Sequence, residues 1–519
     1  MERDKHTHAD DVRTLHEMGY AQELSRRMPS FSNFAISFSI ICVLSGGINS
    51  LGQATSGVGG AAIGIGWPLG VGISGVFALA LAQISSAYPT AGGLYHWGAI
   101  LGNRFTGWLS AWLNLLGLVT VLGAINVGTF YFFLGAFGAQ LGIADSLPVR
   151  VGCVAAITAL QALVNHFGIG LTTKLVDFSG YLIGATAVAL AAVCLGFAET
   201  WDVSRLFTFT NYTGTEGASG VWPTAMPSWL AFTAGLLLPI YTITGYDASA
   251  HTAEETVNAR MSVPSSMVSS VWWSGLFGYV FLCAFILMVP SLEEAARQGW
   301  NVFFWGMGER VPEALRTVLY VAIALSQWLC GLATVTSVSR MIFAFSRDNG
   351  IPGISSLLAR VDPSTRSPAN AIWFGSALSV LFVWFTSAFT IAGTPVYSIV
   401  VSCTVIFLFL SFAVPIALAL FTYRTAKFPS PGPWKLGDGL FRLVCILSLL
   451  SMGIIFYAGI QPPNDWALPV TVGFVLLSLA VWVLVENRRF AGPPTGEEIA
   501  RRRAEIEQVE QRLEGEARR

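Results

Sequence analysis

The sequence predicts an all-α polytopic membrane protein with twelve spans, and three observations support this fold class. Of its 519 residues, 54% are hydrophobic and only 11% are charged, whereas soluble domains carry about 25% charged residues. Twelve apolar stretches are long enough to cross about 30 Å of hydrocarbon. Two of them contain glycine-rich interruptions, which a helix in lipid tolerates only beside a polar cavity. The twelve stretches are residues 31–56, 64–88, 105–141, 148–166, 173–198, 228–250, 264–290, 314–345, 369–388, 393–423, 438–459 and 467–486.

The basic residues predict how these spans are oriented. An even number of spans places both termini on one side of the membrane, and 24 of the 29 Lys and Arg residues fall on that side. Because basic residues accumulate on the cytoplasmic side, we expect a multi-pass protein of the plasma (inner) membrane with both termini cytoplasmic. Residues 1–30 are polar and mixed in charge, so the first apolar stretch is expected to be an uncleaved anchor.

Composition also narrows the function classes. The net charge of −1 gives no indication of a nucleic-acid partner. The seven cysteines all lie in apolar stretches, without CxxC or metal-ligand spacing, so we expect no metal site, no cofactor and no disulfide framework. We find no nucleophile elbow or phosphate-binding loop, and therefore expect a protein that is not an enzyme.

The first interruption is Ser45-Gly46-Gly47-Ile48-Asn49, in the first span. Two adjacent glycines followed by Asn are poor helix interior. If the helix unwinds here, the N–H groups of Gly47, Ile48 and Asn49 become free donors at a half-helix N-terminus, which binds carboxylates without an arginine. The alternative is close helix packing by small residues.

The second interruption lies in the sixth span and reads Tyr241-Thr242-Ile243-Thr244-Gly245-Tyr246-Asp247. A carboxylate inside a membrane span is costly and is a functional candidate. Asp247 could neutralise a substrate amine, take up a coupling proton, or hydrogen-bond the unwound backbone as a purely structural tie. A pair of interrupted helices, one in each half of the chain, is typical of secondary transporters that bind substrate near the bilayer midplane.

The sequence around the second interruption resembles that of a known family. The segment Gly245–Ala259 (GYDASAHTAEETVNA), closed by Pro264, is similar to the sixth-helix signature of the amino acid–polyamine–organocation (APC) superfamily, in its amino acid/choline branch of GABA, choline and polyamine permeases. Three further segments resemble the same branch: LHEMGY…ELSR at 15–26, AYPTAGGLYHW at 87–97 and SRM…SRDNGIP at 339–352.

The resemblance implies a LeuT-type fold, in which two inverted five-helix repeats have discontinuous helices 1 and 6 and two further helices follow. The expected organisation is a cytoplasmic tail at 1–30, the first repeat at 31–198, an extracellular loop at 199–227, the second repeat at 228–424, spans 11 and 12 at 425–486, and a cytoplasmic tail at 487–519.

The same resemblance assigns roles within the substrate site. Ser45, Gly46 and Gly47 occupy the carboxylate-binding position of the family, and Tyr241 the position of an aromatic gate. Free carbonyls around Thr242 to Gly245, including that of Thr244, and those just before Ser45 would receive the amino group. Asn126 in span three could face the site from the side, although interhelical hydrogen bonding is the alternative.

The coupling ion does not follow from the sequence. Some family members place a lysine in the middle of span five, but here that position falls near Ile183, and Lys174 lies at the end of the span. Thr336 and Ser337 of span eight are candidate sodium ligands, while Asp247 and His251 are candidate proton carriers. H⁺ coupling, Na⁺ coupling and ion-free exchange all remain open, as does the oligomeric state.

The sequence thus predicts a permease for amino acids or related small amines that works by alternating access. The glycine pair favours a carboxylate-bearing amine such as GABA; a choline or polyamine permease, or an exchanger, is the alternative. A channel, which would need a continuous polar pore face, and a sensor that binds without transport are the competing classes.

Overall fold

The computed structural model describes residues 2–388, 396–462, 464–494 and 497–517. Within these residues the regular structure is entirely helical, with only isolated β-bridges besides. Eleven helices there are long and apolar enough to cross a membrane. The sixth expected span is instead a shorter apolar helix, Ser228–Thr242, that ends at an interruption. The start of the expected span 393–423 lies outside the described residues.

The long helices follow the apolar stretches of the sequence closely, because the thickness of the hydrocarbon layer sets their length. They are α2 (Ser30–Ile41) with α3 (Val43–Asn49), α5 (Ala61–Gly64) with α6 (Gly66–Ala87), α8 (Arg104–Phe133), α10 (Leu147–His166), α11 (Ile169–Gly196), α15 (Ala259–Met288), α18 (Glu313–Arg347), α20 (Ala369–Ala388), α21 (Val396–Thr422), α22 (Asp438–Gly459) and α23 (Ala467–Val481).

The remaining helices lie between these spans, in the interrupted sixth span or near the chain termini. They are α1 (Glu2–Glu17), α4 (Leu51–Thr55), α7 (Leu94–Leu101), η1 (Leu134–Gly138), α9 (Ala139–Leu141), η2 (Val203–Leu206), η3 (Ala218–Gly220), α12 (Ser228–Gly235), α13 (Leu237–Thr242), α14 (Ala248–His251), η4 (Ala253–Glu255), α16 (Leu292–Arg297), η5 (Gly299–Asn301), α17 (Val302–Arg310), α19 (Ser355–Leu358), η6 (Trp482–Glu486), α24 (Asn487–Arg489) and α25 (Glu497–Ala517).

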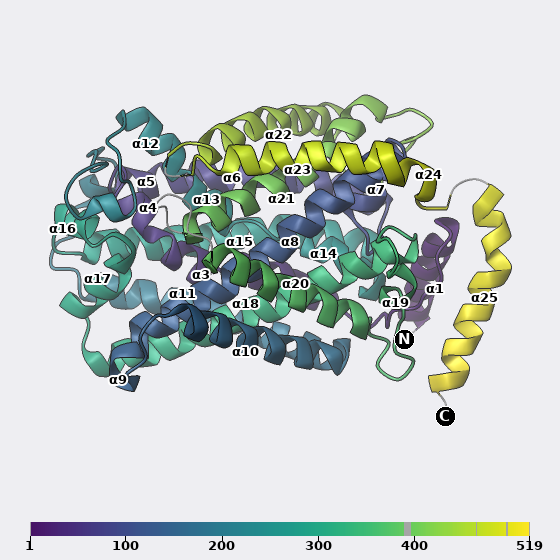
Figure 1. Ribbon diagram of the computed structural model, residues 1–519, viewed down its shortest axis with the longest axis horizontal. Coiled ribbons are helices and arrows are strands. Elements are labelled where there is room, and N and C mark those ends of the chain that lie inside the picture. Colours follow the sequence, from purple (N-terminus) through teal and green to yellow (C-terminus); the bar gives the residue numbers. More distant parts are fainter. Residues whose placement is uncertain (1, 389–395, 463, 495–496, 518–519) are drawn as a thin grey trace.

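Burial separates a central set of helices from a peripheral set. The most apolar windows of the segments Ser30–Asn49 and Arg104–Leu141 are each 89% buried, whereas that of Ala467–Arg489 is only 11% buried. α22 and α23 run along one edge of the bundle (Figure 1). The interrupted helix α2–α3 therefore lies at the centre of the bundle, where irregular backbone can be shielded from lipid.

Both termini lie at one end of the bundle, which we call the terminal end (Figure 1). There α1 contacts α25, and the Glu510 carboxylate lies 2.8 Å from both the His16 ring and the backbone N–H of Gln22. The opposite end carries α4, α5, α12, α16 and α17 (Figure 1).

The terminal end is closed by buried polar contacts. Arg340 makes a bidentate ion pair with Glu255, at 2.8 and 3.0 Å, and Arg347 pairs with Glu254 at 2.8 Å. The Tyr20 hydroxyl donates to the Asp348 carboxylate at 2.6 Å. Burial, and then the nearby Asp348 charge, raise the pKa of Tyr20 well above its usual value, so Tyr20 remains a hydrogen-bond donor. These contacts join the chain before α2 and the segment after α14 to the end of α18.

Candidate functional site

The first helix breaks at Cys42, three residues before the predicted segment. α2 ends at Ile41, Cys42 has φ 14° and ψ 84°, and α3 begins at Val43. The N–H groups of Ser45 and Gly46 already donate to the Cys42 carbonyl, at 2.8 and 3.2 Å. Because the first N–H groups of a helix have no partner within it, the free donors of α3 belong to Val43 and Leu44.

The prediction that Gly47, Ile48 and Asn49 supply these donors is therefore wrong, since all three lie inside α3. The glycines serve close packing instead. A Cβ atom on Gly46 would lie 2.6 Å from the Thr242 hydroxyl oxygen and 2.9 Å from the Thr242 Cα atom. The small residue at position 46 lets the two interrupted helices come into contact. This is the close helix packing by small residues that the sequence left open as an alternative.

The second interruption lies where the sequence predicts it. α13 ends at Thr242, α14 begins at Ala248, and between them Gly245 has φ +92°. L-residues rarely adopt this conformation, and a Cβ at Gly245 would lie 2.3 Å from Cγ2 of Ile40. The Ser37 hydroxyl of α2 donates to the Tyr246 carbonyl at 2.9 Å, so the second break is tied to α2.

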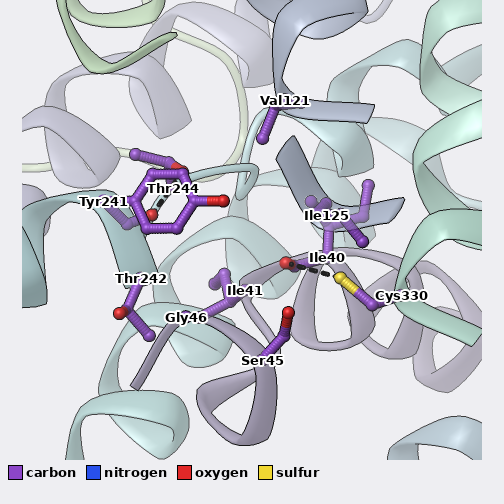
Figure 2. A pocket seen from close by; sticks show the side chains of 10 residues that line it. All are labelled: Ile40, Ile41, Ser45, Gly46, Val121, Ile125, Tyr241, Thr242, Thr244 and Cys330. Carbon is purple, nitrogen blue, oxygen red and sulfur yellow. Dashed lines mark hydrogen bonds between the residues drawn. The ribbon is translucent and has the colours of Figure 1, made fainter. Parts of the chain in front are cut away.

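A small pocket lies between the two breaks and is lined by ten residues. Figure 2 shows the Ser45 hydroxyl and the Tyr241 ring converging on this space. Five of the lining residues were predicted from the sequence and five were not. The predicted ones are Ser45, Gly46, Tyr241, Thr242 and Thr244; the others are Ile40, Ile41, Val121, Ile125 and Cys330. None of these lining residues has a charged side chain at neutral pH.

The five unpredicted residues come from α2, α8 and α18 and are apolar or weakly polar. The Cys330 thiol donates to the Ile40 carbonyl at 3.3 Å. Side chains of these types occur throughout membrane helices, so the sequence does not distinguish these five residues from other residues of the spans.

Several predicted residues do not line the pocket. Asn126 instead joins α8 to α10, because its amide group exchanges hydrogen bonds with Gln161 at 2.9 and 3.0 Å and also donates to Thr158. Asn49 donates to Gln327 at 3.3 Å. The lining also lacks Gly47, Ile48, Gly245, Tyr246 and Asp247.

Asp247 lies between the break and α14, and its side chain is 1% exposed. Its Oδ2 atom accepts from Asn114 of α8 at 3.3 Å and lies 3.3 Å from Nε2 of His251. Within the described residues, its Oδ1 atom and Nε2 of His251 are both buried without a hydrogen-bond partner. Asn114 was not predicted, although it is a polar residue inside an apolar stretch, as Asn126 is.

The candidate sodium ligands on α18 are buried. The Thr336 hydroxyl donates to Asn165 of α10 at 2.7 Å, and the Ser337 hydroxyl has no partner in the described part of the chain. Ile183 is buried on α11. Thr336 thus already has a structural role between α18 and α10.

Comparisons with known proteins agree with this architecture. A family model described as amino acid permease matches residues 30–485. The chain is 31% identical to the amino-acid permease BAT1 of Arabidopsis thaliana, over 92% of this chain and 95% of the relative. It is 30% identical to the BAT1 homolog of Oryza sativa subsp. japonica, over 93% of this chain and 95% of that protein. It is also 26% identical to amino-acid permease 2 of Neurospora crassa, over 93% of this chain and 89% of the relative.

These matches confirm the resemblance to the APC superfamily. The relatives are named as permeases, which are transporters rather than enzymes. Together with eleven apolar helices of spanning length in the described residues, they show a multi-pass membrane protein. The chain belongs to the amino acid permease family.

Proposed function

We propose that this protein is a secondary active transporter that carries a zwitterionic amino acid across the plasma membrane by alternating access. The observation that carries the proposal is the pocket between the two helix breaks, to which both breaks contribute lining residues. In the proposed LeuT-type arrangement, α2–α3 and α13–α14 are the discontinuous first helices of two inverted repeats. The terminal end, with both chain termini, is cytoplasmic, in keeping with 24 of 29 basic residues on that side.

The pocket chemistry favours a substrate with a carboxylate and an amine. Ser45 and Gly46, in the first half of α3, line the pocket, and the positive end of the helix dipole favours an anionic group there. The unwound segment after Thr242 offers carbonyls to an ammonium group. Because no lining residue carries a charge at neutral pH, a ligand of zero net charge fits best. Choline or a polyamine, the alternative substrates, would leave the start of α3 without an anionic partner.

Transport by purified protein in liposomes tests this proposal. The panel contains labelled α-amino acids, GABA, choline and a polyamine, with proton and sodium gradients imposed separately. We expect saturable uptake of at least one amino acid, accelerated by the same amino acid inside the vesicles. Uptake of choline or the polyamine alone would contradict the substrate class, and flux that neither saturates nor shows counterflow would indicate a channel.

Cys330 provides a native probe of the pocket. Its thiol lines the pocket and is buried, so a small thiol-specific methanethiosulfonate reagent should reach it only when the pocket opens. We expect the reagent to inhibit uptake by at least about tenfold, and a saturating transported amino acid to slow the inhibition.

The Cys330→Ser variant supplies the control, because a hydroxyl can donate to the Ile40 carbonyl in place of the thiol but does not react. It should transport and resist the reagent. Equal inhibition of this variant would place the reactive cysteine elsewhere, and inhibition unaffected by substrate would argue against binding beside Cys330.

A further inference from the structure

We propose that the C-terminal helix α25 is an autoinhibitory latch, which holds the terminal end closed and thereby restrains transport. The helix is docked against two parts of the chain that are far apart in the sequence, the segment before α2 and the end of α18. The docking contacts stand on their own geometry. The restraint on transport rests on the function proposed above, in which the terminal end must open for the substrate to pass.

The polar contact between α25 and the segment before α2 is made by Glu510. Its carboxylate accepts from the backbone N–H of Gln22 at 2.8 Å and lies 2.8 Å from Nε2 of His16. The side chains of His16 and Glu510 are 33% and 26% exposed, so water screens their interaction only in part. A hydrogen bond from a backbone N–H to a carboxylate is among the stronger kinds, and here it fixes α25 against Gln22.

An apolar face of α25 packs at the same place. Ile499, Ile506 and Leu513 recur every seven residues, which puts them on one face of the helix. Ile506 and Leu513 are only 6% and 5% exposed, and α1 and α25 lie next to each other at the terminal end (Figure 1). Gly19 has φ +83°, and a Cβ atom there would lie 2.8 Å from Cγ of Pro494 and 3.2 Å from Cγ1 of Ile499. The chain after α1 therefore comes into close contact with α25.

The second docking surface is Asp348, directly after α18. Its side chain is completely buried, and its Oδ2 atom accepts from the hydroxyls of Tyr20 and Tyr95 at 2.6 and 2.9 Å and lies 3.4 Å from Nε2 of His96. The Oδ1 atom has no hydrogen-bond partner in the described part of the chain. The guanidinium group of Arg502 on α25 lies 3.9 Å from this atom. Because a buried carboxylate is costly without a compensating charge, the docked α25 stabilises Asp348 in its closed position.

The residues just before α25 are anchored on α18. The Arg489 guanidinium donates to the carbonyls of Asn349 and Gly350 at 2.6 and 3.1 Å. The Phe490 ring is completely buried, with its centroid 5.7 Å from that of Phe345. The contacts to the segment before α2 are therefore the ones that must break when the terminal end opens. Because the anchor keeps the local concentration of α25 high, the helix can dock again after each opening.

The closed terminal end brings the two docking surfaces together. The Tyr20 hydroxyl joins the segment before α2 to Asp348, and the buried pair of Arg340 with Glu255 joins α18 to the segment after α14. In alternating access these parts separate when the terminal end opens. A group that binds one of two states more tightly shifts the population toward that state. Since α25 contacts both surfaces at once, it favours the closed state, and its release shifts the population toward the open one.

A buried reporter on α18 tests the latch without any substrate. Ser339 is completely buried beside Arg340, and its nine-residue separation from Asp348 corresponds to about 13 Å along the helix axis. In the full-length protein in phosphatidylcholine nanodiscs, Ser339→Cys introduces a thiol that a charged thiol reagent reaches when the terminal end opens. The rate of its modification, followed by peptide mass spectrometry to distinguish it from the native cysteines, measures this opening.

Two matched pairs of variants on α25 complete the test. Glu510→Ala removes the contact with the segment before α2, whereas Glu507→Ala removes an exposed carboxylate three residues earlier. Arg502→Gln and Arg501→Gln each break an ion pair with the residue four positions earlier, and Arg502 also faces Asp348.

We expect Glu510→Ala to raise the modification rate roughly tenfold, the size expected for losing one hydrogen bond to a charged group. Arg502→Gln should raise it about threefold, because its ion pair is partly exposed. Both control variants should match the protein that carries the reporter alone. Hydrogen exchange of residues 16–28, measured without the reporter, should accelerate in the same two variants. Faster exchange confined to α25 itself, with an unchanged modification rate, would overturn the latch.

Uptake of labelled amino acids into liposomes tests the restraint on transport. Glu510→Ala should raise the initial rate about threefold, as expected where the opening of a closure limits turnover, while Glu507→Ala should match the wild type. Equal or slower uptake in Glu510→Ala would refute the restraint. If no form of the protein transports an amino acid but the modification rates differ as expected, the latch stands and the transport proposal falls.

Discussion

Gly46→Ala should lower amino acid uptake by at least about tenfold, whereas Gly47→Ala should lower it by less than about threefold. A Cβ at position 46 would lie 2.9 Å from the backbone Cα atom of Thr242, so the two interrupted helices must move apart. A Cβ at position 47 would lie 3.3 Å from the rim of the Phe281 ring and 3.8 Å from a methyl group of Leu282, with no backbone atom among these neighbours. Inserting one methyl group into a well-packed core costs about 1–3 kcal/mol. At position 46 the methyl group would lie between the two interrupted helices that form the walls of the pocket.

The adjacent glycines provide a matched pair, because both lie in α3 and both variants add one methyl group. Initial uptake rates in liposomes should be normalised to the amount of monodisperse protein, which separates loss of transport from loss of folding. Gly46→Leu should abolish uptake. Wild-type uptake and affinity in Gly46→Ala would show that the contact between Gly46 and Thr242 does not shape the substrate site.

The sequence was a good guide wherever a single strong physical rule acts. The long helices follow the apolar stretches because the bilayer imposes their length. The second break was predicted at the correct residues because Gly245 needs a positive φ that L side chains avoid. The sixth apolar stretch, however, is long enough to cross a membrane, but before the break it forms only the shorter helix Ser228–Thr242.

The first break shows where this reasoning fails. A glycine can be required for backbone freedom or for close approach, and the two requirements look identical in a sequence. Gly46 has a close neighbour in Thr242, while the unusual backbone angles belong to Cys42. The contact partner comes from a segment almost two hundred residues away, so tertiary packing decides between the two requirements.

The two asparagines of α8 illustrate a second limit. Asn114 and Asn126 are both buried in the same helix, but twelve residues at 3.6 per turn place them on faces about 120° apart. Asn114 therefore contacts Asp247 while Asn126 contacts α10. Apolar residues surround both positions, so the hydrophobic pattern does not reveal which face of α8 points toward the pocket.

Glu255→Gln should destabilise the closed terminal end far more than a comparable change in an exposed ion pair. Glu255 and Arg340 are at most 1% exposed and joined by two hydrogen bonds. Removing one partner of a buried pair costs about 3–5 kcal/mol, because the other charge stays buried without compensation. We expect a clear fall in the midpoint of thermal unfolding and faster hydrogen exchange at the end of α18.

The exposed pair Arg424–Asp438 is the control, since its side chains are 45% and 56% exposed. Surface pairs contribute about 0–1 kcal/mol, so Asp438→Asn should leave the midpoint nearly unchanged. The double variant Arg340→Met with Glu255→Met removes both buried charges and should recover much of the stability that Glu255→Gln loses. If the ion pair also holds the terminal end closed, the double variant should be stable and yet exchange quickly at the end of α18. If the double variant recovered both the unfolding midpoint and slow exchange at the end of α18, burial at this position, and not the ion pair, would keep the end closed.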